Sequence, residues 1–387
     1  MPRATLDTEK AVQERYGRAA RAPERELCCP TRYDPRYLEA IPKEILQRDF
    51  GCGDPTPYLQ AGDTVLDLGC GAGKICFIAA QIVGPKGKVI GVDFNDEMLN
   101  LARTHQPEVA RRLTYDNVTF LRGRIQDLAL PLDEVEAYLA ARPVRSAAAL
   151  AEFEAFAERL RTTAPLIPND SVDVIVSNCV LNLVKDTDKE KLFAEMYRVL
   201  KRGGRAAISD VVADENVPAA MKCDPKLWSG CISGAFREDK FLEAFEHAGF
   251  YGIEIARRDD QPWQTVRGIE FRSVTVTARK GKEGPCLERN QAVIYKGPWK
   301  EVRDDDGHVL RRGQRMAVCD KTYKILTSAP YAEETIAVPP RREVPLRQAR
   351  GFACSGAALR DPQETKGKRY QKTLAATKSV CGPEGCC

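Results

Sequence analysis

The stretch that decides the fold is VLDLGCGAGK, residues 65–74. A short apolar run ends here in Gly69, Gly71 and Gly73, and helical texture follows. A buried strand that turns through glycines into a helix lets the backbone approach a ligand closely, and the helix N-terminus adds a positive end. The stretch therefore predicts a strand–loop–helix unit that binds a nucleotide-type ligand.

Further strands and helices alternate after this unit. Short apolar runs predict strands at 88–93, 117–123, 171–178 and 205–212. A helix is predicted at 95–105, and another at 189–202 stops at the pair Gly203–Gly204. Strands that alternate with helices indicate an α/β fold, with a parallel sheet covered on both faces.

Changes in composition and hydrophobic pattern divide the chain into segments. An N-terminal helical segment, 1–60, has helices predicted at 8–20 and 35–48. The main domain is 61–282, with an alanine-rich helical insert at 131–165 and substrate-binding elements near 179–235. A small α+β domain is predicted at 283–340, and a flexible, basic, cysteine-containing tail at 341–387.

Composition excludes several classes of protein. The 387 residues include 59 basic and 55 acidic side chains, a net charge of +4, which does not favour a nucleic-acid-binding surface. The N-terminus has no apolar core, so no signal peptide is expected. The longest apolar run, 171–184, is interrupted by Asp173, Asn178 and Asn182 and is too short to cross a bilayer. We expect a soluble, cytoplasmic monomer.

Cysteine is unusually frequent and histidine is scarce. Fourteen cysteines are spread along the whole chain, which favours a reducing compartment and thiol chemistry, metal chemistry or plain packing. The three histidines, His105, His247 and His308, are far apart in sequence. We therefore expect a chemistry that does not use imidazole as a base.

Two acidic residues strengthen the interpretation of the glycine loop. Asp67 precedes it, and Asp93 ends the second predicted strand, where a carboxylate can accept hydrogen bonds from both ribose hydroxyls. Dinucleotide binding is the competing interpretation, but the third glycine of G-x-G-x-x-G is missing, because Lys74 and Ile75 follow Gly73.

Four cysteines lie beside the loop or near later strand ends: Cys52, Cys76, Cys179 and Cys231. The carboxyl ends of parallel strands converge on the ligand crevice, so these thiols are predicted to gather near the cofactor. No pair has the C-x-x-C spacing of structural zinc sites, and no structural metal is expected. Dispersed thiolates prefer soft, thiophilic ions. A buried cysteine that only packs remains the alternative for each.

The glycine loop resembles motif I of the class I S-adenosylmethionine-dependent methyltransferases. The resemblance continues through GVD (91–93), LRGRIQDL (121–128) and MYRVLKRGGR (196–205). It implies a Rossmann-like, seven-stranded, mostly parallel sheet and S-adenosylmethionine as cofactor. The residues it implies at the cofactor are Asp67, Gly69, Cys70, Gly71, Gly73, Asp93, Phe94, Ile125, Gln126 and Asn178.

The surroundings of the cysteines resemble a narrower family, the arsenite methyltransferases. GCG-x-P-x-P (51–57), SNCV-x-NLV (177–184) and LW-x-x-C-x-x-GA (227–235) carry this resemblance, which runs from about Tyr33 to Val338. It implies methyl transfer to trivalent arsenic, As(III), in arsenic detoxification. It assigns Cys179 and Cys231 to As(III), and Cys76 and Cys52 to the third thiolate and to disulfide exchange.

The resemblance also implies a reducing partner, thioredoxin or glutathione, while no nucleic acid or membrane partner is expected. One departure is that Lys74–Ile75 stands where the family usually has Arg–Asp, which leaves the contacts to the methionine portion of the cofactor open. Cys70 is interpreted as loop packing without a role at arsenic.

Two other functions stay open: methylation of a small organic acceptor such as a quinone, and sequestration of a metalloid without catalysis. Cys28–Cys29, and Cys381, Cys386 and Cys387 of the tail, are candidates for arsenic capture or are thiols without a function. The remaining cysteines are interpreted as structural: Cys223, Cys286, Cys319 and Cys354.

Overall fold

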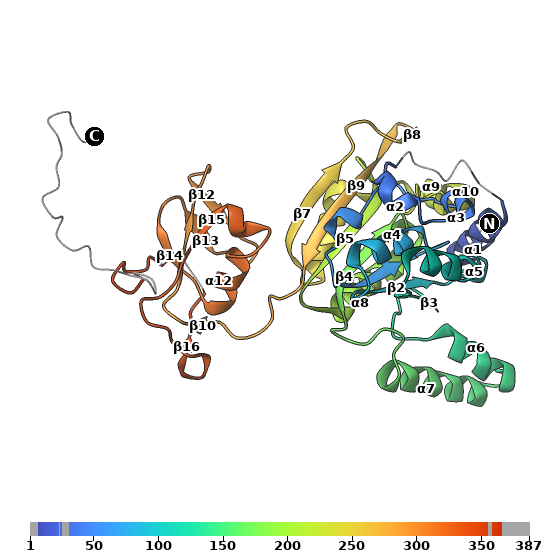
Figure 1. Cartoon of the computed structure of the whole chain (residues 1–387), viewed down its shortest axis with the longest axis horizontal. Helices are drawn as coiled ribbons and strands as arrows, with labels where there is room; N and C mark the ends of the chain where they lie inside the picture. Colours follow the sequence, from blue (N-terminus) through green and yellow to red (C-terminus); the bar gives the residue numbers. More distant parts are fainter. Residues whose placement is uncertain (1–6, 23, 25–30, 355–357, 366–387) are drawn as a thin grey trace, which may run out of the picture. The chain divides into compact units, whose positions relative to one another are not determined.

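The computed structural model describes residues 7–22, 24, 31–354 and 358–365. They belong to two compact units, the first ending at Gly281 and the second beginning at Lys282 (Figure 1). Cys28, Cys29 and the three cysteines of the C-terminal tail lie outside the described residues.

The first unit is built on one sheet with the strand order β3-β2-β1-β4-β5-β9-β7. The first five strands of this order are parallel, and β9 is antiparallel to both of its neighbours β5 and β7. Their bounds are β1 Thr64–Leu68, β2 Lys88–Asp93, β3 Val118–Arg122, β4 Val172–Asn178, β5 Leu200–Ala213, β7 Tyr251–Arg258 and β9 Ile269–Arg279. Two short strands are added, β6 Phe236–Arg237 on β5 and β8 Gln264–Val266 on β9. The predicted seven-stranded, mostly parallel sheet is confirmed.

Alternate side chains of the strands point to opposite faces, and each face carries its own core. Val65 and Val174 pack under α4 (Lys74–Val83) and α5 (Asp96–Leu113). Their neighbours Leu66 and Ile175 pack with side chains of α8 (Lys189–Val199) and α11 (Glu238–His247) on the other face. Because the strands are apolar on both faces, the sheet is buried between these helix layers, and its strand ends are left for a site.

The N-terminal segment has α1 (Thr8–Arg21), α2 (Pro35–Leu38), α3 (Lys43–Leu46) and a short 3-10 helix, η2 (Thr56–Tyr58). The helix predicted at 35–48 is therefore two short pieces, since Pro42 lacks the N–H that a continuous helix would need. Asp7 caps α1 by accepting a hydrogen bond from the Lys10 N–H at 3.2 Å.

The insert is a pair of helices, α6 (Leu132–Ala141) and α7 (Ala147–Thr163), that stands away from the sheet (Figure 1). The Tyr138 and Phe156 rings stack at 4.2 Å between centroids, and Arg161 pairs with Asp127 at 2.8 Å. These contacts hold the two helices together and attach them to the segment after β3. This arrangement is that of a surface insertion.

Short elements follow the strands at the carboxyl edge of the sheet. After β4 come two 3-10 helices, η3 (Leu181–Leu183) and η4 (Asp186–Asp188). After β5 come α9 (Ala219–Lys222) and α10 (Pro225–Ser229). These short elements place Cys179 and Cys231 near the strand ends.

The described residues of the second unit form three small sheets and one α-helix. Its strands are β10 Leu287–Glu288, β11 Ala292–Tyr295, β12 Glu301–Arg303, β13 Val309–Arg311, β14 Arg315–Ala317, β15 Thr335–Val338 and β16 Arg350–Gly351. The helices are α12 Asp320–Leu326 and the 3-10 turns η5 Tyr331–Glu333 and η6 Leu346–Gln348. The prediction of a flexible tail from residue 341 is wrong for 346–351, because β16 pairs with β10. A two-residue strand leaves no alternating pattern by which a sequence could reveal it.

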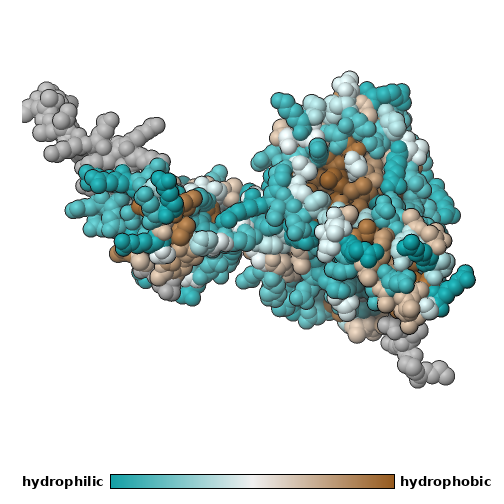
Figure 2. Space-filling model, turned by 90° about the horizontal axis from the view of Figure 1, so that it is seen from below, coloured by the Kyte–Doolittle hydropathy of each residue, from teal (hydrophilic) through white to brown (hydrophobic). Residues whose placement is uncertain are grey.

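On the face that Figure 2 shows, most residues are hydrophilic, and the first unit has an apolar hollow. Across the part of the chain that the structure describes, every helix is too short or too polar to cross a bilayer.

Candidate active site

The glycine loop joins β1 to α4 with left-handed backbone at each glycine, φ 67° at Gly69, 51° at Gly71 and 86° at Gly73. A Cβ on Gly69 would lie 2.3 Å from Val180, and one on Gly73 would lie 2.7 Å from Phe120. At Gly71 no atom lies within 4 Å of the Cβ position. The glycines therefore serve different ends: two permit close packing of the loop, and Gly71 leaves open space in front of its backbone.

Asp93 ends β2 and fixes this loop. Its carboxylate accepts hydrogen bonds from the Gly71 N–H at 2.8 Å and from the Asn95 N–H at 2.9 Å. Burial raises the pKa of Asp93, and the backbone N–H groups oppose that shift. Each oxygen still has a lone pair for a ligand, so the carboxylate can accept from a hydroxyl while it holds the loop.

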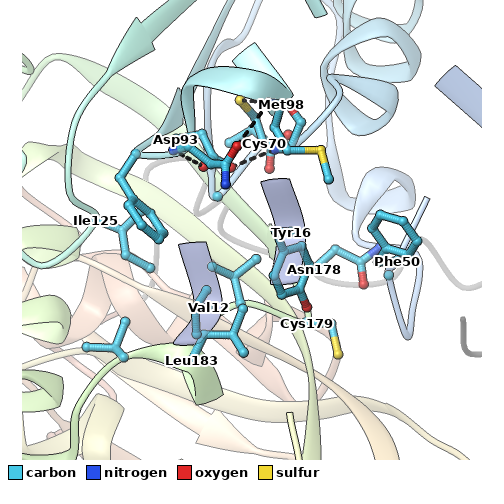
Figure 3. A pocket seen from close by; sticks show the side chains of 18 of the residues that line it. Val12, Tyr16, Phe50, Cys70, Asp93, Met98, Ile125, Asn178, Cys179 and Leu183 are labelled. Atoms are coloured by element: carbon cyan, nitrogen blue, oxygen red, sulfur yellow. Dashed lines mark hydrogen bonds between the residues drawn. The ribbon is translucent and has the colours of Figure 1, made fainter. Parts of the chain in front are cut away.

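A cavity opens between this loop, α1 and the end of β4 (Figure 3). In the figure Asp93 and Cys70 lie at one side of it, and Cys179 lies with Tyr16 and Asn178 at another. The predicted cofactor residues that line it are Asp67, Gly69, Cys70, Gly71, Asp93, Phe94, Ile125, Gln126 and Asn178. Gly73 is placed behind the loop, against Phe120.

Cys76 lies beneath the loop, away from the other predicted arsenic ligands. It is fully buried on the inner side of α4, and its thiol donates to the Asp67 carboxylate at 3.2 Å. Burial raises the pKa of Asp67 to about 7, with the Cys76 hydrogen bond opposing and the charge of Asp93 adding to the shift. Burial, then its contacts with Cys70 and Asp67, raise the pKa of Cys76. The structure thus favours a supporting position for Cys76 under the cofactor loop.

The other three predicted cysteines, Cys52, Cys179 and Cys231, pack in one buried group, named here the sheet-edge cluster. Asn178, the last residue of β4, draws the Cys52 segment to the sheet. Its side-chain oxygen accepts from the Cys52 N–H at 2.8 Å and the Gly53 N–H at 3.0 Å, and its NH₂ donates to the Gly53 carbonyl at 2.7 Å. Asn178 therefore both lines the cavity and positions Cys52.

Cys179 and Cys231 share an unusual backbone. Both adopt left-handed conformations, φ 63° and 62°, which residues other than glycine seldom occupy. The Cys231 thiol donates to the Cys179 carbonyl at 3.2 Å. Strained backbone of this kind clusters at functional sites, where it fixes the direction of a side chain. Cys179 also lines the cofactor cavity, so it connects that cavity to the cluster.

Asp210 is a buried acid that the sequence analysis did not single out. One of its oxygens and the sulfurs of Cys52 and Cys179 all lie within 4.8 Å of one another. It accepts from the Leu181 N–H and from the Asn182 side chain, both at 2.8 Å. Burial raises its pKa to about 7, against backbone hydrogen bonds from Val211, Leu181 and Asn182. The one signal in the sequence that could have identified Asp210 was its position in a predicted strand, near the carboxyl edge of the sheet.

Helix α1 covers both the cavity and the cluster. Thr8, Glu9, Val12 and Tyr16 line the cavity from this helix. The pKa of Tyr16 is raised by burial and then by the charges of Cys231 and Cys179, with a hydrogen bond to Cys231 adding to the shift. The buried Arg15 side chain donates to the Lys226 carbonyl at 2.8 Å and ties α1 to α10. The sequence pattern predicted this helix but did not indicate that it covers the cavity and the cluster.

Lys74 occupies the position at which the sequence departs from the family pattern. It lines the cavity, forms an ion pair with Asp49, and lies 3.4 Å from the centre of the Tyr33 ring. Asp49, which also lines the cavity, places a carboxylate beside Lys74.

None of the three histidines is among the described residues that line the cavity. His105 contacts Glu44 at 3.1 Å, His247 ends α11, and His308 belongs to the second unit. That imidazole is not the base stays a prediction.

The cavity fits an adenosyl cofactor on three observations. Gly71 presents open space beside a helix N-terminus, Asp93 presents acceptors for hydroxyls, and the lining adds the apolar Phe94, Met98 and Ile125. These residues would hold S-adenosylmethionine between the loop and Cys179. Three of the lining cations are paired with acids: Lys74 with Asp49, Arg124 with Glu9 and Arg48 with Glu44.

Comparison with known proteins agrees with this geometry. A family described as "Methyltransferase domain" matches residues 59–249, and a domain of unknown function matches 282–370. The arsenite methyltransferase of Aquipseudomonas alcaligenes is 31% identical, over 84% of this chain and 88% of that protein. The arsenite methyltransferase of Mus musculus is 28% identical over 98% of both chains.

A solved structure, an arsenic(III) S-adenosylmethionine methyltransferase from Chlamydomonas reinhardtii, has a TM-score of 0.53 and 26% identity. The match covers 84% of this chain and 99% of that one.

Proposed function

The chain belongs to the arsenite methyltransferases and methylates trivalent arsenic with S-adenosylmethionine, and we propose that Cys52, Cys179 and Cys231 hold the arsenic during the transfer. The observation that carries this assignment is the position of Cys179, which lines the cofactor cavity and belongs to the sheet-edge cluster. A group bound to its sulfur would face the cofactor.

Thiolates suit the substrate, because trivalent arsenic is a soft centre that three sulfurs satisfy while it keeps a lone pair. The strained backbone of Cys179 and Cys231 directs their side chains, and Asn178 brings Cys52 to them. Arsenic bound in this way lies behind α1, where Tyr16 and the apolar lining exclude water.

Bound S-adenosylmethionine supplies an electrophilic methyl group and a neutral leaving group. The arsenic lone pair takes up that methyl group with no proton to remove. The absence of histidine from the cavity lining is consistent with this chemistry, since the step needs no general base.

Methyl transfer formally oxidises arsenic by two electrons, and returning it to the trivalent state requires two thiolates, which become a disulfide. We assign this exchange to Cys52 with a partner of the same cluster. An external dithiol or thiol, thioredoxin or glutathione, would then restore the thiols. We also propose that the protein acts as a monomer in a reducing compartment such as the cytoplasm.

The place of Cys76 in this proposal is structural. Its thiol is committed to Asp67 beneath the loop, whereas Cys52 belongs to the sheet-edge cluster. We therefore prefer Cys52 to Cys76 as the third thiolate.

The test is an acceptor comparison with methyl-labelled S-adenosylmethionine and a thiol reductant. Purified protein is given As(III), methylarsenite or a reduced naphthoquinone, and labelled products are separated and counted. Label on both arsenicals and none on the quinone is the expected result. Label on the quinone alone would move the function to an organic acceptor, and As(III) binding without any labelled product would indicate sequestration.

A further inference from the structure

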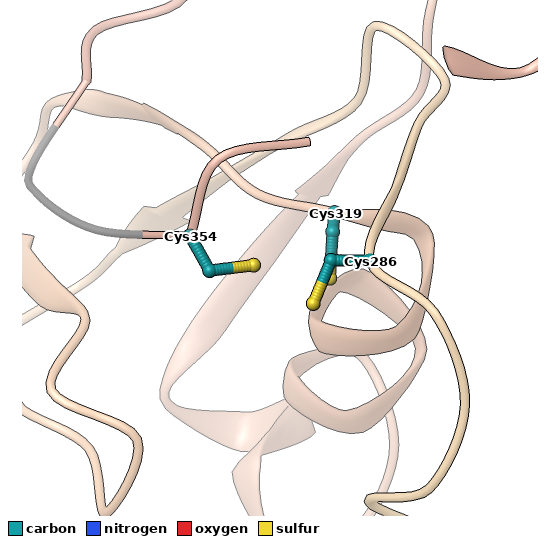
Figure 4. Close-up of side chains that lie close together, drawn as sticks. All are labelled: Cys286, Cys319 and Cys354. Atoms are coloured by element: carbon teal, nitrogen blue, oxygen red, sulfur yellow. The ribbon is translucent and has the colours of Figure 1, made fainter. Parts of the chain in front are cut away.

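A second group of three thiols lies in the C-terminal unit, formed by Cys286, Cys319 and Cys354. Their sulfurs all lie within 4.8 Å of one another (Figure 4). This group, named here the C-terminal cluster, belongs to a different compact unit from the sheet-edge cluster. Sequence analysis treated its members as separate structural cysteines.

Backbone pairing brings two of the three together. β10 pairs with β16 through Leu287 opposite Gly351, and the Phe352 N–H donates to the Cys286 carbonyl at 2.9 Å. Cys286 immediately precedes β10, and Cys354 follows β16. The pairing therefore fixes these two cysteines side by side.

The third cysteine is anchored to the same framework. Cys319 caps α12, and Arg289, which follows β10, donates to Asp320 of α12 at 2.7 Å. Arg360 pairs with Glu288 of β10 at 2.8 Å. Backbone pairing joins the Cys354 segment to Cys286, and the Arg289–Asp320 ion pair joins α12 to the same strand, so the cluster is a built feature of the unit.

Hydrogen bonds surround the sulfur of Cys319. Burial would raise the pKa of Cys319, but hydrogen bonds from the Thr322 hydroxyl and N–H, and from Cys354 and Cys286, outweigh it and lower that pKa. The Thr322 hydroxyl lies 3.2 Å and its N–H 3.4 Å from the sulfur. Burial and the two neighbouring cysteines raise the pKa of Cys354. The thiolate is the form of cysteine that binds a thiophilic ion, and these contacts on Cys319 favour that form.

The number of ligands distinguishes between the ions that thiols bind. Structural zinc takes four ligands in a tetrahedron. In the described part of the chain, this group contains three sulfurs and no further His, Cys, Asp or Glu ligand within the same distance. Trivalent arsenic is satisfied by three sulfurs, because its lone pair fills the remaining position. Cys286 and Cys354 are also partly exposed, so an incoming ion can reach them.

We propose that Cys286, Cys319 and Cys354 form a second binding site for trivalent arsenic, separate from the site of methyl transfer. Arsenous acid exchanges its three hydroxyl groups for three thiolates, and the thiol protons leave with those hydroxyls as water. No oxidant or reductant is required. The site goes beyond the proposed catalysis, since it binds the substrate in a unit whose described residues contain no glycine loop of the cofactor type.

The experiment uses the full chain with competing thiols replaced. The background variant changes Cys52, Cys179, Cys231, Cys28, Cys29, Cys381, Cys386 and Cys387 to Ser. After reduction and exposure to As(III), arsenic per chain is measured by mass spectrometry and its neighbours by X-ray absorption. The expected result is about one arsenic per chain with three sulfur neighbours.

Single changes on that background identify the ligands. Cys286→Ser, Cys319→Ser and Cys354→Ser should each weaken As(III) binding by at least about tenfold, the scale on which even outer contacts of a metal centre act. Cys223→Ser, at an exposed cysteine of the first unit, is the matched control and should change nothing. Circular dichroism checks folding, and Cys354→Ser, at a partly exposed position, is the variant least expected to disturb it.

Two results would overturn the site: no arsenic retained by the folded background variant, or retention that the three single changes leave unaltered. A third would reassign it, namely zinc with four ligands that As(III) does not displace. In that case His308 would be tested as the fourth zinc ligand, because its Nε2 is buried without a partner among the described residues. Loss of zinc from the His308→Ala variant would identify it as that ligand. Failure of the proposed catalysis is separate, because it is measured as methylation in a chain whose sheet-edge cluster is intact.

Discussion

The sheet-edge cluster and the C-terminal cluster each consist of three cysteines, but the surrounding secondary structure differs. The first is buried at the end of a parallel sheet, with two of its cysteines in left-handed backbone and one of them lining a cofactor cavity. The second is held by a two-residue strand pair and the start of α12, and is partly exposed. Both clusters offer three thiols to a soft ion, but the sheet-edge cluster also borders the cofactor cavity that methyl transfer requires.

The strongest test of this contrast removes single thiols of the sheet-edge cluster. Cys179→Ser and Cys231→Ser should each lower arsenic methylation by about a thousandfold or more, as loss of an essential reacting group does. Cys286→Ser, in the other cluster, should leave saturated turnover near the wild-type value. Methylated arsenicals separated and counted over time give the rates. Substantial turnover by Cys179→Ser would remove the special position given to it.

A second test separates cofactor binding from arsenic binding within the first unit. Asp93→Ala removes hydrogen bonds from a charged group and should weaken S-adenosylmethionine binding by about a hundredfold. As(III) binding should stay nearly unchanged, because Asp93 contacts the glycine loop and not the cluster. Calorimetry measures the first and equilibrium dialysis the second.

Asp93→Asn is the matched control, since it keeps one oxygen as an acceptor for the loop. Loss of As(III) binding together with cofactor binding in a folded Asp93→Ala protein would contradict the division between the two parts of the site.

A third test concerns Cys52 and sharpens the contrast between binding and redox exchange. Cys52→Ser should lower methylation of arsenite roughly tenfold and that of methylarsenite less, because the proposed disulfide step restores trivalent arsenic between methyl transfers. Cys76→Ser, beneath the loop, should lack this selectivity. The measurement is the ratio of the two initial rates, and equal loss on both substrates would refute the early role of Cys52.

The smallest expected effect is on stability and concerns Asp67. Its folded pKa of about 7 lies above the unfolded value of about 3.9, so the folded state holds an extra proton between these pH values. Its contribution is fully present below about pH 4 and is lost as pH rises to about 7. Asp67→Asn should therefore remove about 2 kcal/mol of the fall in unfolding free energy between pH 5 and pH 8.

Urea unfolding at both pH values measures this difference. Glu134→Gln, at an exposed position of α6, is the control and should keep the wild-type pH dependence. An unchanged dependence in Asp67→Asn would mean that Asp67 is ionised in the folded protein.

Sequence patterns predicted the sheet and the cofactor loop because both depend on local order. Alternating strands and helices and the spacing from Gly73 to Asp93 are visible in the chain itself. The family resemblance placed Cys76 with the arsenic ligands, whereas in the fold α4 turns its side chain inward to Asp67. Sequence proximity to a loop does not give the rotation of the helix that follows.

The features that sequence patterns missed depend on contacts between distant segments. Tyr16 reaches the cluster because Arg15 fastens α1 to α10. The C-terminal cluster depends on the β10–β16 pair, which is too short to leave a periodic pattern. Neither contact has a local signature, so both became visible only in the fold.

The central claim is that the sheet-edge cluster, and not the C-terminal one, presents arsenic to the methyl group. The most direct measurement incubates As(III), methyl-labelled S-adenosylmethionine and a thiol reductant with three proteins: the wild type, Cys179→Ser, and a variant with Cys286, Cys319 and Cys354 all changed to Ser. Labelled arsenic from the wild type and from the triple variant, with none from Cys179→Ser, is the predicted result. Labelled arsenic from Cys179→Ser, or its loss from a folded triple variant, would contradict the account.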